Sequence, residues 1–181
     1  RPSINYSKLV LNFGSQTRIP REFENLVNTQ IAFPIKPFLD SYELIKKEDI
    51  YDSVKEPPFV IVGSGLAAIE VAYALRKRWR DRSLKLFCHK KKIKKKILKS
   101  LVDSDITLVD DLQFEYGKIL LCTGTICPQW VEKRFLRLDP RGRIITNQNL
   151  QFKYSSGIFA VGDCAVLDHF KTPASGIYAV K

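Results

Sequence analysis

The chain has 181 residues, 45% hydrophobic and 27% charged, and this balance excludes an intrinsically disordered protein. Its 30 lysines and arginines outnumber its 19 aspartates and glutamates, so the formal net charge is +11 and the surface should attract phosphates, nucleic acid or anionic lipid. Apolar runs such as Phe59–Val62 are far shorter than the roughly 18 residues of a membrane span. We therefore expect no span, while peripheral contact with a membrane stays open.

The first sixty residues carry strand, turn and helix signals. Lys8–Phe13 is apolar and is predicted to form a strand that closes in the turn Gly14-Ser15. Gln16–Pro37 contains three prolines and is interpreted as a crossing segment. Phe38–Lys47 has apolar residues at helical spacing, and Pro57-Pro58 ends that part of the chain.

The centre of the chain predicts a βαβ unit. Phe59–Val62 is typical of a short buried strand, Gly63–Ala68 of a glycine turn, Ile69–Arg80 of a helix and Leu84–Cys88 of a second strand. Further elements are a helix with the stripe Ile93, Ile97, Leu98, Leu101 and Val102, and strands at Ile106–Val109, Lys118–Cys122, Gly142–Thr146 and Gly157–Val161. Alternating strands and helices imply an α/β fold with a largely parallel sheet.

The glycine turn has the pattern of a dinucleotide-binding turn. Gly63-Ser64-Gly65-Leu66-Ala67-Ala68 reads G-x-G-x-x-A between a strand and a helix, which is the context that this motif requires. Gly63 permits the tight turn, Gly65 lets the backbone approach a pyrophosphate, and Ala68 lets the helix pack closely on the strand. The diphosphate would sit on free N–H groups of the first helical turn. The alternative is a glycine turn that binds no ligand.

The residues after the second strand bear on the choice of cofactor. An NAD site usually has an acidic residue there, and an NADP site a basic group for the 2′-phosphate. Here the strand runs into His89, Lys90 and Lys91 without a carboxylate, so we expect NADPH to be accepted at least as well as NADH. Alternatively, these residues belong with the following lysines to the solvated face of a helix.

Three further segments carry a resemblance to a family. Leu120-Leu121-Cys122-Thr123-Gly124 looks like the strand-plus-ATG segment of two-dinucleotide flavoprotein reductases, 157–165 like their FAD signature, and Lys8–Ser15 like the strand returning from the FAD domain. The chain thus resembles the pyridine nucleotide-disulfide oxidoreductase superfamily, and most closely its type II NADH dehydrogenase-like branch. Ile35-Lys36-Pro37, Gly63–Glu70 and Pro173–Val180 are most similar to the flavin oxidoreductase fused to selenide, water dikinase in some bacteria.

The resemblance implies a Rossmann-like NAD(P)-binding domain nested within part of an FAD-binding domain. We place the NAD(P)-binding domain at residues 33–131 and the partial FAD-binding domain at residues 1–32 and 132–181. The family's first glycine-rich turn would precede Arg1 and its interface domain would follow Lys181, and the chain contains no methionine. We therefore expect a fragment of a longer protein, which by itself would hold FAD weakly or not at all.

The same resemblance implies that a hydride passes from NAD(P)H to FAD and that electrons leave for a separate, unknown acceptor. It places the aspartate of Gly162-Asp163 on the ribityl chain of FAD and Glu70 near the nicotinamide. Thr123-Gly124 would form a close-packed turn beneath the cofactor, and a helix opening near Gly176 and Tyr178 would direct its dipole at the flavin. The alternatives are an exposed Glu70, an Asp163 that caps a turn, and a Tyr178 in the core.

The cysteines and the net charge bear on other possible functions. Cys122 and Cys127 have the C-x-x-x-x-C spacing of some disulfide reductases, but those pairs lie on a helix soon after the first FAD turn, so we expect no catalytic thiol. Because the sequence has no CxxC motif, we also expect no metal site and no disulfide framework. Cysteines of this kind fit a reducing cytoplasmic compartment. The charge comes without a nucleic-acid-binding motif, so no nucleic acid partner is expected. A non-catalytic dinucleotide-binding module or sensor stays an alternative function. A Rossmann-like methyltransferase is a weaker alternative. The sequence does not indicate the oligomeric state.

Overall fold

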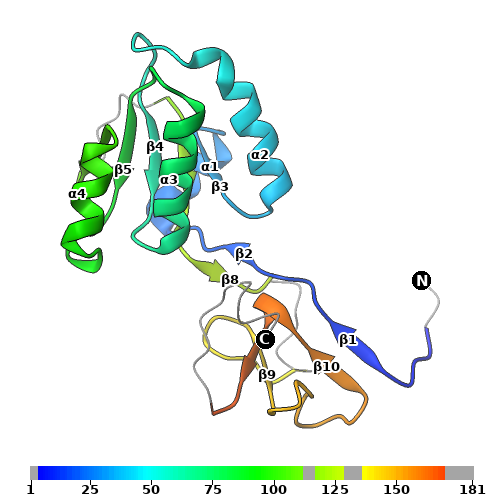
Figure 1. Ribbon diagram of the computed structural model, residues 1–181. Helices are drawn as coiled ribbons and strands as arrows, with labels where there is room; N and C mark the ends of the chain where they lie inside the picture. The colour runs from blue at the N-terminus through cyan, green and yellow to red at the C-terminus, as the bar shows by residue number, and fades with distance from the viewer. Residues whose placement is uncertain (1–3, 112–116, 129–135, 170–181) are drawn as a thin grey trace. The chain divides into compact units, whose positions relative to one another are not determined.

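The computed structural model describes residues 4–111, 117–128 and 136–169 (Figure 1). The chain divides into two compact units. One is formed by residues 17–124, and the other by the residues before 17 together with those after 124.

The unit 17–124 contains a five-stranded parallel sheet in the order β3-β7-β4-β5-β6. The strands are β3 (Ala32–Pro34), β4 (Phe59–Val62), β5 (Leu84–Phe87), β6 (Ile106–Val109) and β7 (Ile119–Leu121). All four residues of β4 are buried, because a central parallel strand is covered on both faces. Pro34 lies in the edge strand β3, where a missing N–H costs little.

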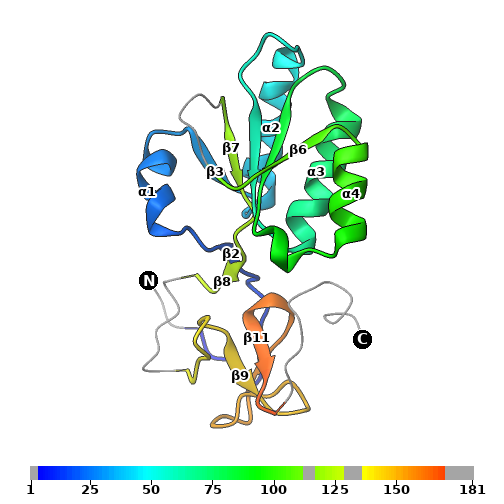
Figure 2. The ribbon, with the colours of Figure 1, turned by 90° about the vertical axis from the view of Figure 1, so that its left-hand side faces the viewer.

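Helices cover both faces of this sheet, as Figure 2 shows. Helix α1 (Arg21–Asn28) packs Phe23 on one face, against Val60 and Val62. The other face carries α2 (Phe38–Lys47), α3 (Leu66–Arg78) and α4 (Lys95–Asp103). Their buried side chains, among them Ala72 and Leu101, join Ile61 in the larger core cluster. Two short 3-10 helices, η1 (Glu48–Tyr51) and η2 (Lys90–Lys92), follow α2 and β5.

A buried ion pair and an aspartate tie η1 to the end of α3. The Arg82 guanidinium donates to Glu48 Oε2 at 2.8 Å, and its side chain is only 2% exposed. Its Cζ lies 5.3 Å from the ring centre of Phe59 and 5.4 Å from that of Trp79. Asp49 accepts hydrogen bonds from Arg78 Nε at 2.6 Å and from Trp79 Nε1 at 2.8 Å. These contacts anchor the segment between α2 and β4.

The second unit is built from small parallel strand pairs. β1 (Leu9–Leu11) pairs with β10 (Ile158–Ala160), and β9 (Ile144–Thr146) pairs with β11 (Ala165–Leu167). Ile144, Phe152 and Ala160 form its core. A 3-10 turn, η3 (Gly162–Cys164), joins β10 to β11. Two further short strands are β2 (Gln16–Thr17) and β8 (Thr125–Ile126).

The α/β class and the parallel sheet are confirmed, and three elements have their predicted bounds: α2, β4 and β6. Helix α3 begins at Leu66, directly after its N-cap Gly65 and three residues before the predicted start at Ile69. The predicted stripe beginning at Ile93 was partly wrong. Ile93 is buried, but the following helix begins only at Lys95, and Val102 is 57% exposed.

The interpretation of Gln16–Pro37 as a crossing segment was wrong, since it contains α1 and β3. The unit boundaries differ from the expected ones for related reasons. Residues 17–32 belong with the five-stranded sheet, because Phe23 packs on Val60 and Val62. The second boundary falls after Gly124 and not after Val131, since Cys127 N donates to Arg141 O at 3.0 Å within the smaller unit. Within the described ranges, no helix is long and apolar enough to cross a membrane.

The contacts of Asp49 predict how stability depends on pH. The hydrogen bond from Arg78, helped by that from Trp79, holds the pKa of Asp49 below its usual value. The carboxylate therefore stabilises the fold fully above about pH 4, and this contribution is lost as the pH falls through the lower pKa of the folded state. In urea titrations between about pH 4 and pH 2, the free energy of unfolding of Asp49→Asn should vary less with pH than that of the parent.

Arg78→Met removes the donor and leaves the carboxyl group, so it should flatten the pH dependence in the same way. A parent-like pH dependence in both variants would contradict the assignment to Asp49.

Candidate functional site

The glycine turn lies at the carboxyl edge of the five-stranded sheet, between β4 and α3. Gly63 N donates to Phe87 O at the end of β5, at 3.0 Å. Cys122 N, just beyond β7, donates to Val62 O at 2.8 Å. The turn is therefore held between the ends of the two strands that flank β4, which is where open α/β sheets bind their ligands.

Gly63 and Gly65 are needed for different reasons. A Cβ on Gly63 would lie 2.4 Å from the carbonyl oxygen of Cys122 and 3.0 Å from the Cβ of Ala68, so the packing of the protein excludes a side chain there. Gly65 has φ −90° and ψ 173°, which any residue adopts, and a Cβ there would meet no atom within 4 Å. Contacts within the described chain do not account for glycine at position 65, but a close approach by a ligand would.

The open space at Gly65 adjoins the N-terminus of α3. The N-cap is Gly65, so no side chain caps the first turn of the helix. Leu66 and Ala67, which follow it, are exposed. The first N–H groups of a helix have no partner within it and carry partial positive charge. Ala68 is fully buried against the sheet, which fixes the direction of these N–H groups. The helix end can therefore receive an anion.

The end of β5 is held beside this turn. The backbone N–H of His89 donates to Ser64 Oγ at 2.8 Å. His89, Lys90 and Lys91 are all exposed. Lys90 Nζ lies 3.1 Å from Oδ2 of Asp110, the residue that directly follows β6. The sequence interpretation missed this carboxylate because it considered only the residues after the second strand. Adjacent parallel strands end at the same edge, and that rule would have pointed to Asp110.

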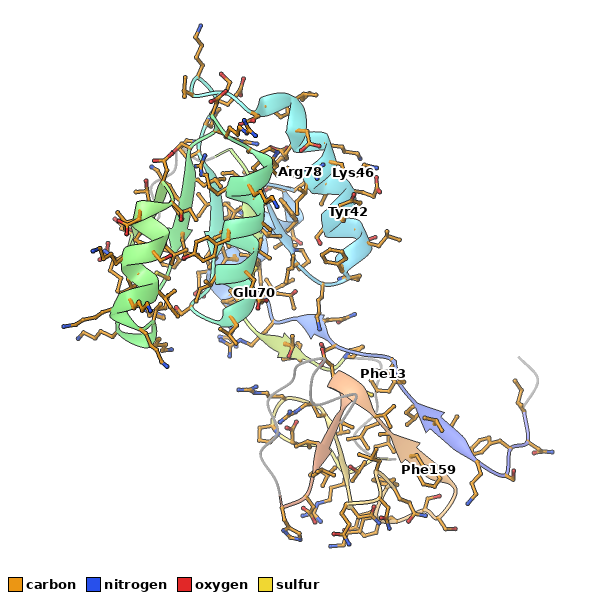
Figure 3. All side chains as sticks on the ribbon, viewed as in Figure 1. Phe13, Tyr42, Lys46, Glu70, Arg78 and Phe159 are labelled. Carbon is orange, nitrogen blue, oxygen red and sulfur yellow. The ribbon has the colours of Figure 1, made fainter. Side chains whose placement is uncertain are left out.

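Three other predicted residues, Thr123, Gly124 and Glu70, lie in the same unit. The hydroxyl of Thr123 donates to Arg18 O, and Gly124 O accepts from Arg18 N at 2.9 Å, so this turn joins the end of β7 to the segment before α1. Glu70 lies one turn into α3 with its side chain exposed (Figure 3). It is four residues after Leu66 and so shares that residue's exposed helix face, close to the N-terminus.

The predicted flavin-side residues lie in the smaller unit. Ser15 Oγ donates to Asp163 Oδ2 at 2.9 Å, which fixes the carboxylate in η3. Gly162 has φ +69°, and a Cβ there would lie 2.8 Å from Asn12 Oδ1. The turn after β10 is thus packed closely against the end of β1. Gly176 and Tyr178 lie outside the described residues.

The four cysteines are free and buried. Burial raises the pKa of Cys122 to about 12 and that of Cys127 to about 11, so both are thiols at neutral pH and poor nucleophiles. In the part of the chain that the structure describes, no group of three or more His, Cys, Asp or Glu side chains could hold a metal ion.

The sequence matches no protein-family model and no curated protein. Solved structures match well. An engineered water-forming NADPH oxidase bound to NADPH has a TM-score of 0.70 at 21% identity, over 90% of this chain and 40% of that one. An NAD-dependent persulfide reductase from A. fulgidus has a TM-score of 0.69 at 16% identity, over 90% of this chain and 34% of that one. A thioredoxin reductase from Lactococcus lactis in the FR conformation has a TM-score of 0.63 at 16% identity, over 91% of this chain and 59% of that one.

The chain thus spans less than two thirds of each of these proteins. The α/β fold with a parallel sheet that was expected from the sequence is confirmed, and these solved oxidoreductases share it.

Alanine at the two glycines should affect stability to very different extents. Gly63→Ala pushes a methyl group into the Cys122 carbonyl and should lower the free energy of unfolding by about 2–3 kcal/mol. Gly65→Ala enters open space and should change it by less than about 1 kcal/mol, because alanine is only a poorer N-cap. Urea unfolding measures both, and equal losses in the two variants would contradict the geometry described here.

Proposed function

We propose that the protein is a flavin-dependent oxidoreductase that takes a hydride from NAD(P)H onto FAD and passes the electrons to a separate acceptor. When bound, reduced nicotinamide supplies the hydride and FAD accepts it. The observation that carries the proposal is the open space at Gly65, where a Cβ would meet no atom within 4 Å, beside the N-terminus of α3. The task of this chain is to bind the two dinucleotides and fix their orientation.

The nicotinamide dinucleotide would be held at the glycine turn. The N–H groups of Leu66 and Ala67 are placed to donate to its diphosphate, and the lack of a side chain at Gly65 lets that group come close. His89 and Lys91 extend from the end of β5, where the adenosine ribose of such a ligand lies. Their positive or hydrogen-bonding groups suit a 2′-phosphate. The engineered oxidase of similar fold was solved with NADPH bound, which supports this ligand class.

FAD would be held by Asp163 in the smaller unit. Ser15 Oγ donates to Oδ2 of Asp163, which orients the carboxylate, and we infer that this oriented group accepts from a ribityl hydroxyl. Gly162 precedes Asp163 with φ +69°, and a Cβ there would lie 2.8 Å from Asn12 Oδ1, so a side chain at this position would disturb the turn that carries the carboxylate. Glu70, exposed near the start of α3, is proposed as the carboxylate on the nicotinamide side.

The finer parts of the proposal are supported by the sequence resemblance. They are the type II NADH dehydrogenase-like assignment, the link to selenide, water dikinase and the separate acceptor. A cytoplasmic location fits the four free, buried cysteines, since thiols persist in a reducing compartment.

The flavin part of the proposal is tested through Asp163. In the full-length protein, Asp163→Ala removes the acceptor for the ribityl chain and should lower the FAD bound per protein by about tenfold at limiting flavin, as expected for loss of a charge-assisted hydrogen bond. Visible absorbance of the purified protein gives the flavin content.

Asp168→Ala is the matched control, because it removes another aspartate of the same unit, whose ion pairs with described residues are long, at 3.8 Å to Lys153 and to His169. Full flavin content in Asp163→Ala would show that Asp163 does not bind FAD. A parent protein that binds NADPH and carries no flavin would instead establish the non-catalytic module or sensor.

A further inference from the structure

We propose that Asp110 is a specificity-determining residue of the dinucleotide site, which lowers the preference for NADPH by pairing with Lys90. The inference rests on the proposed function, since it concerns the cofactor that the glycine turn receives. It assigns a role to the residue that directly follows β6, which lies outside the glycine turn and outside the segment after β5.

Strand register brings Asp110 to the site. β5 and β6 are parallel, with Phe87 opposite Val109, and Cys88 N donates to Val109 O at 3.2 Å. The chains leaving both strands therefore start side by side at the same edge. Because His89 N is bonded to Ser64 of the glycine turn, that edge is also the one where the dinucleotide would lie.

The ion pair is open to solvent on both sides. The side chain of Lys90 is 43% exposed and that of Asp110 is 78% exposed, with Nζ and Oδ2 3.1 Å apart. Exposed pairs of this kind add little to stability, so the fold does not depend on this one. Among described residues, the neighbouring Lys91 and Lys92 make no ion pair. Lys90 is thus distinguished from the lysines beside it by an acidic partner.

This arrangement opposes a phosphate in two ways. A 2′-phosphate that approached Lys90 would compete with a carboxylate that already accepts from its ammonium group. It would also stand close to the negative charge of Asp110, whereas the neutral 2′-hydroxyl of NADH would not be repelled. Removing the charge of Asp110 should therefore favour NADPH over NADH by about three- to tenfold, within the range of a partly screened surface interaction.

The test measures the Kd of NADPH and of NADH by isothermal titration calorimetry with the full chain, which requires no bound flavin. Asp110→Asn should raise the ratio of NADPH to NADH affinity by about three- to tenfold, and Lys90→Ala should lower it by a similar factor. The double variant should return close to the parent ratio, because it loses one charge of each sign. Asp103→Asn is the matched control, since it neutralises an exposed aspartate at the C-terminal end of α4 and should leave the ratio unchanged.

The outcomes separate the inference from the proposed function. If neither cofactor binds the parent, the dinucleotide site itself is wrong and the role of Asp110 is overturned with it. If both bind and Asp110→Asn shifts the ratio by less than about twofold, or no more than Asp103→Asn does, the role of Asp110 is overturned and the proposed function stands. Circular dichroism at the titration temperature shows that each variant is folded.

Discussion

The site depends on the close approach of Gly63 to the carbonyl oxygen of Cys122. No side chain fits between them, and the same glycine is in contact distance of Ala68 at the start of α3. This contact fixes the ends of β4 and β7 and the first turn of α3 as one rigid group. The N-terminus of α3 therefore points at a defined position above the sheet edge, and the open space at Gly65 lies there. An anion site of this kind needs its donors fixed before the ligand arrives, because ordering them on binding would cost affinity.

The smaller unit repeats the same physical solution with different residues. β1 and β10 are parallel, and the turn after β10 is fixed by Gly162 against Asn12 and by Ser15 on Asp163. In both units a parallel strand ends in a glycine that packing or backbone conformation requires. In both, a polar or charged group follows within two residues. Binding groups at the carboxyl ends of parallel strands are what dinucleotide-binding folds share.

Local patterns predicted much of this fold, and contacts between distant segments account for what was missed. β4 and α2 were predicted with their observed bounds, because a short buried strand and an amphipathic helix each show in a few consecutive residues. α1 was missed because Pro20 directly precedes it and its single buried side chain, Phe23, gives no clear stripe. The glycine turn was recognised from its spacing. Asp110 was not, because its position beside Lys90 depends on the pairing of β5 with β6.

The central claim is that the N-terminus of α3 receives the diphosphate of a nicotinamide dinucleotide. The most direct measurement is an NMR titration of the ¹⁵N-labelled protein with NADPH, followed at the backbone amides. The account predicts that the largest shifts occur at Gly65, Leu66 and Ala67, and that Gly65→Ala remains folded but loses them. Shifts confined to other parts of the chain, or a Gly65→Ala variant that binds NADPH as the parent does, would contradict it.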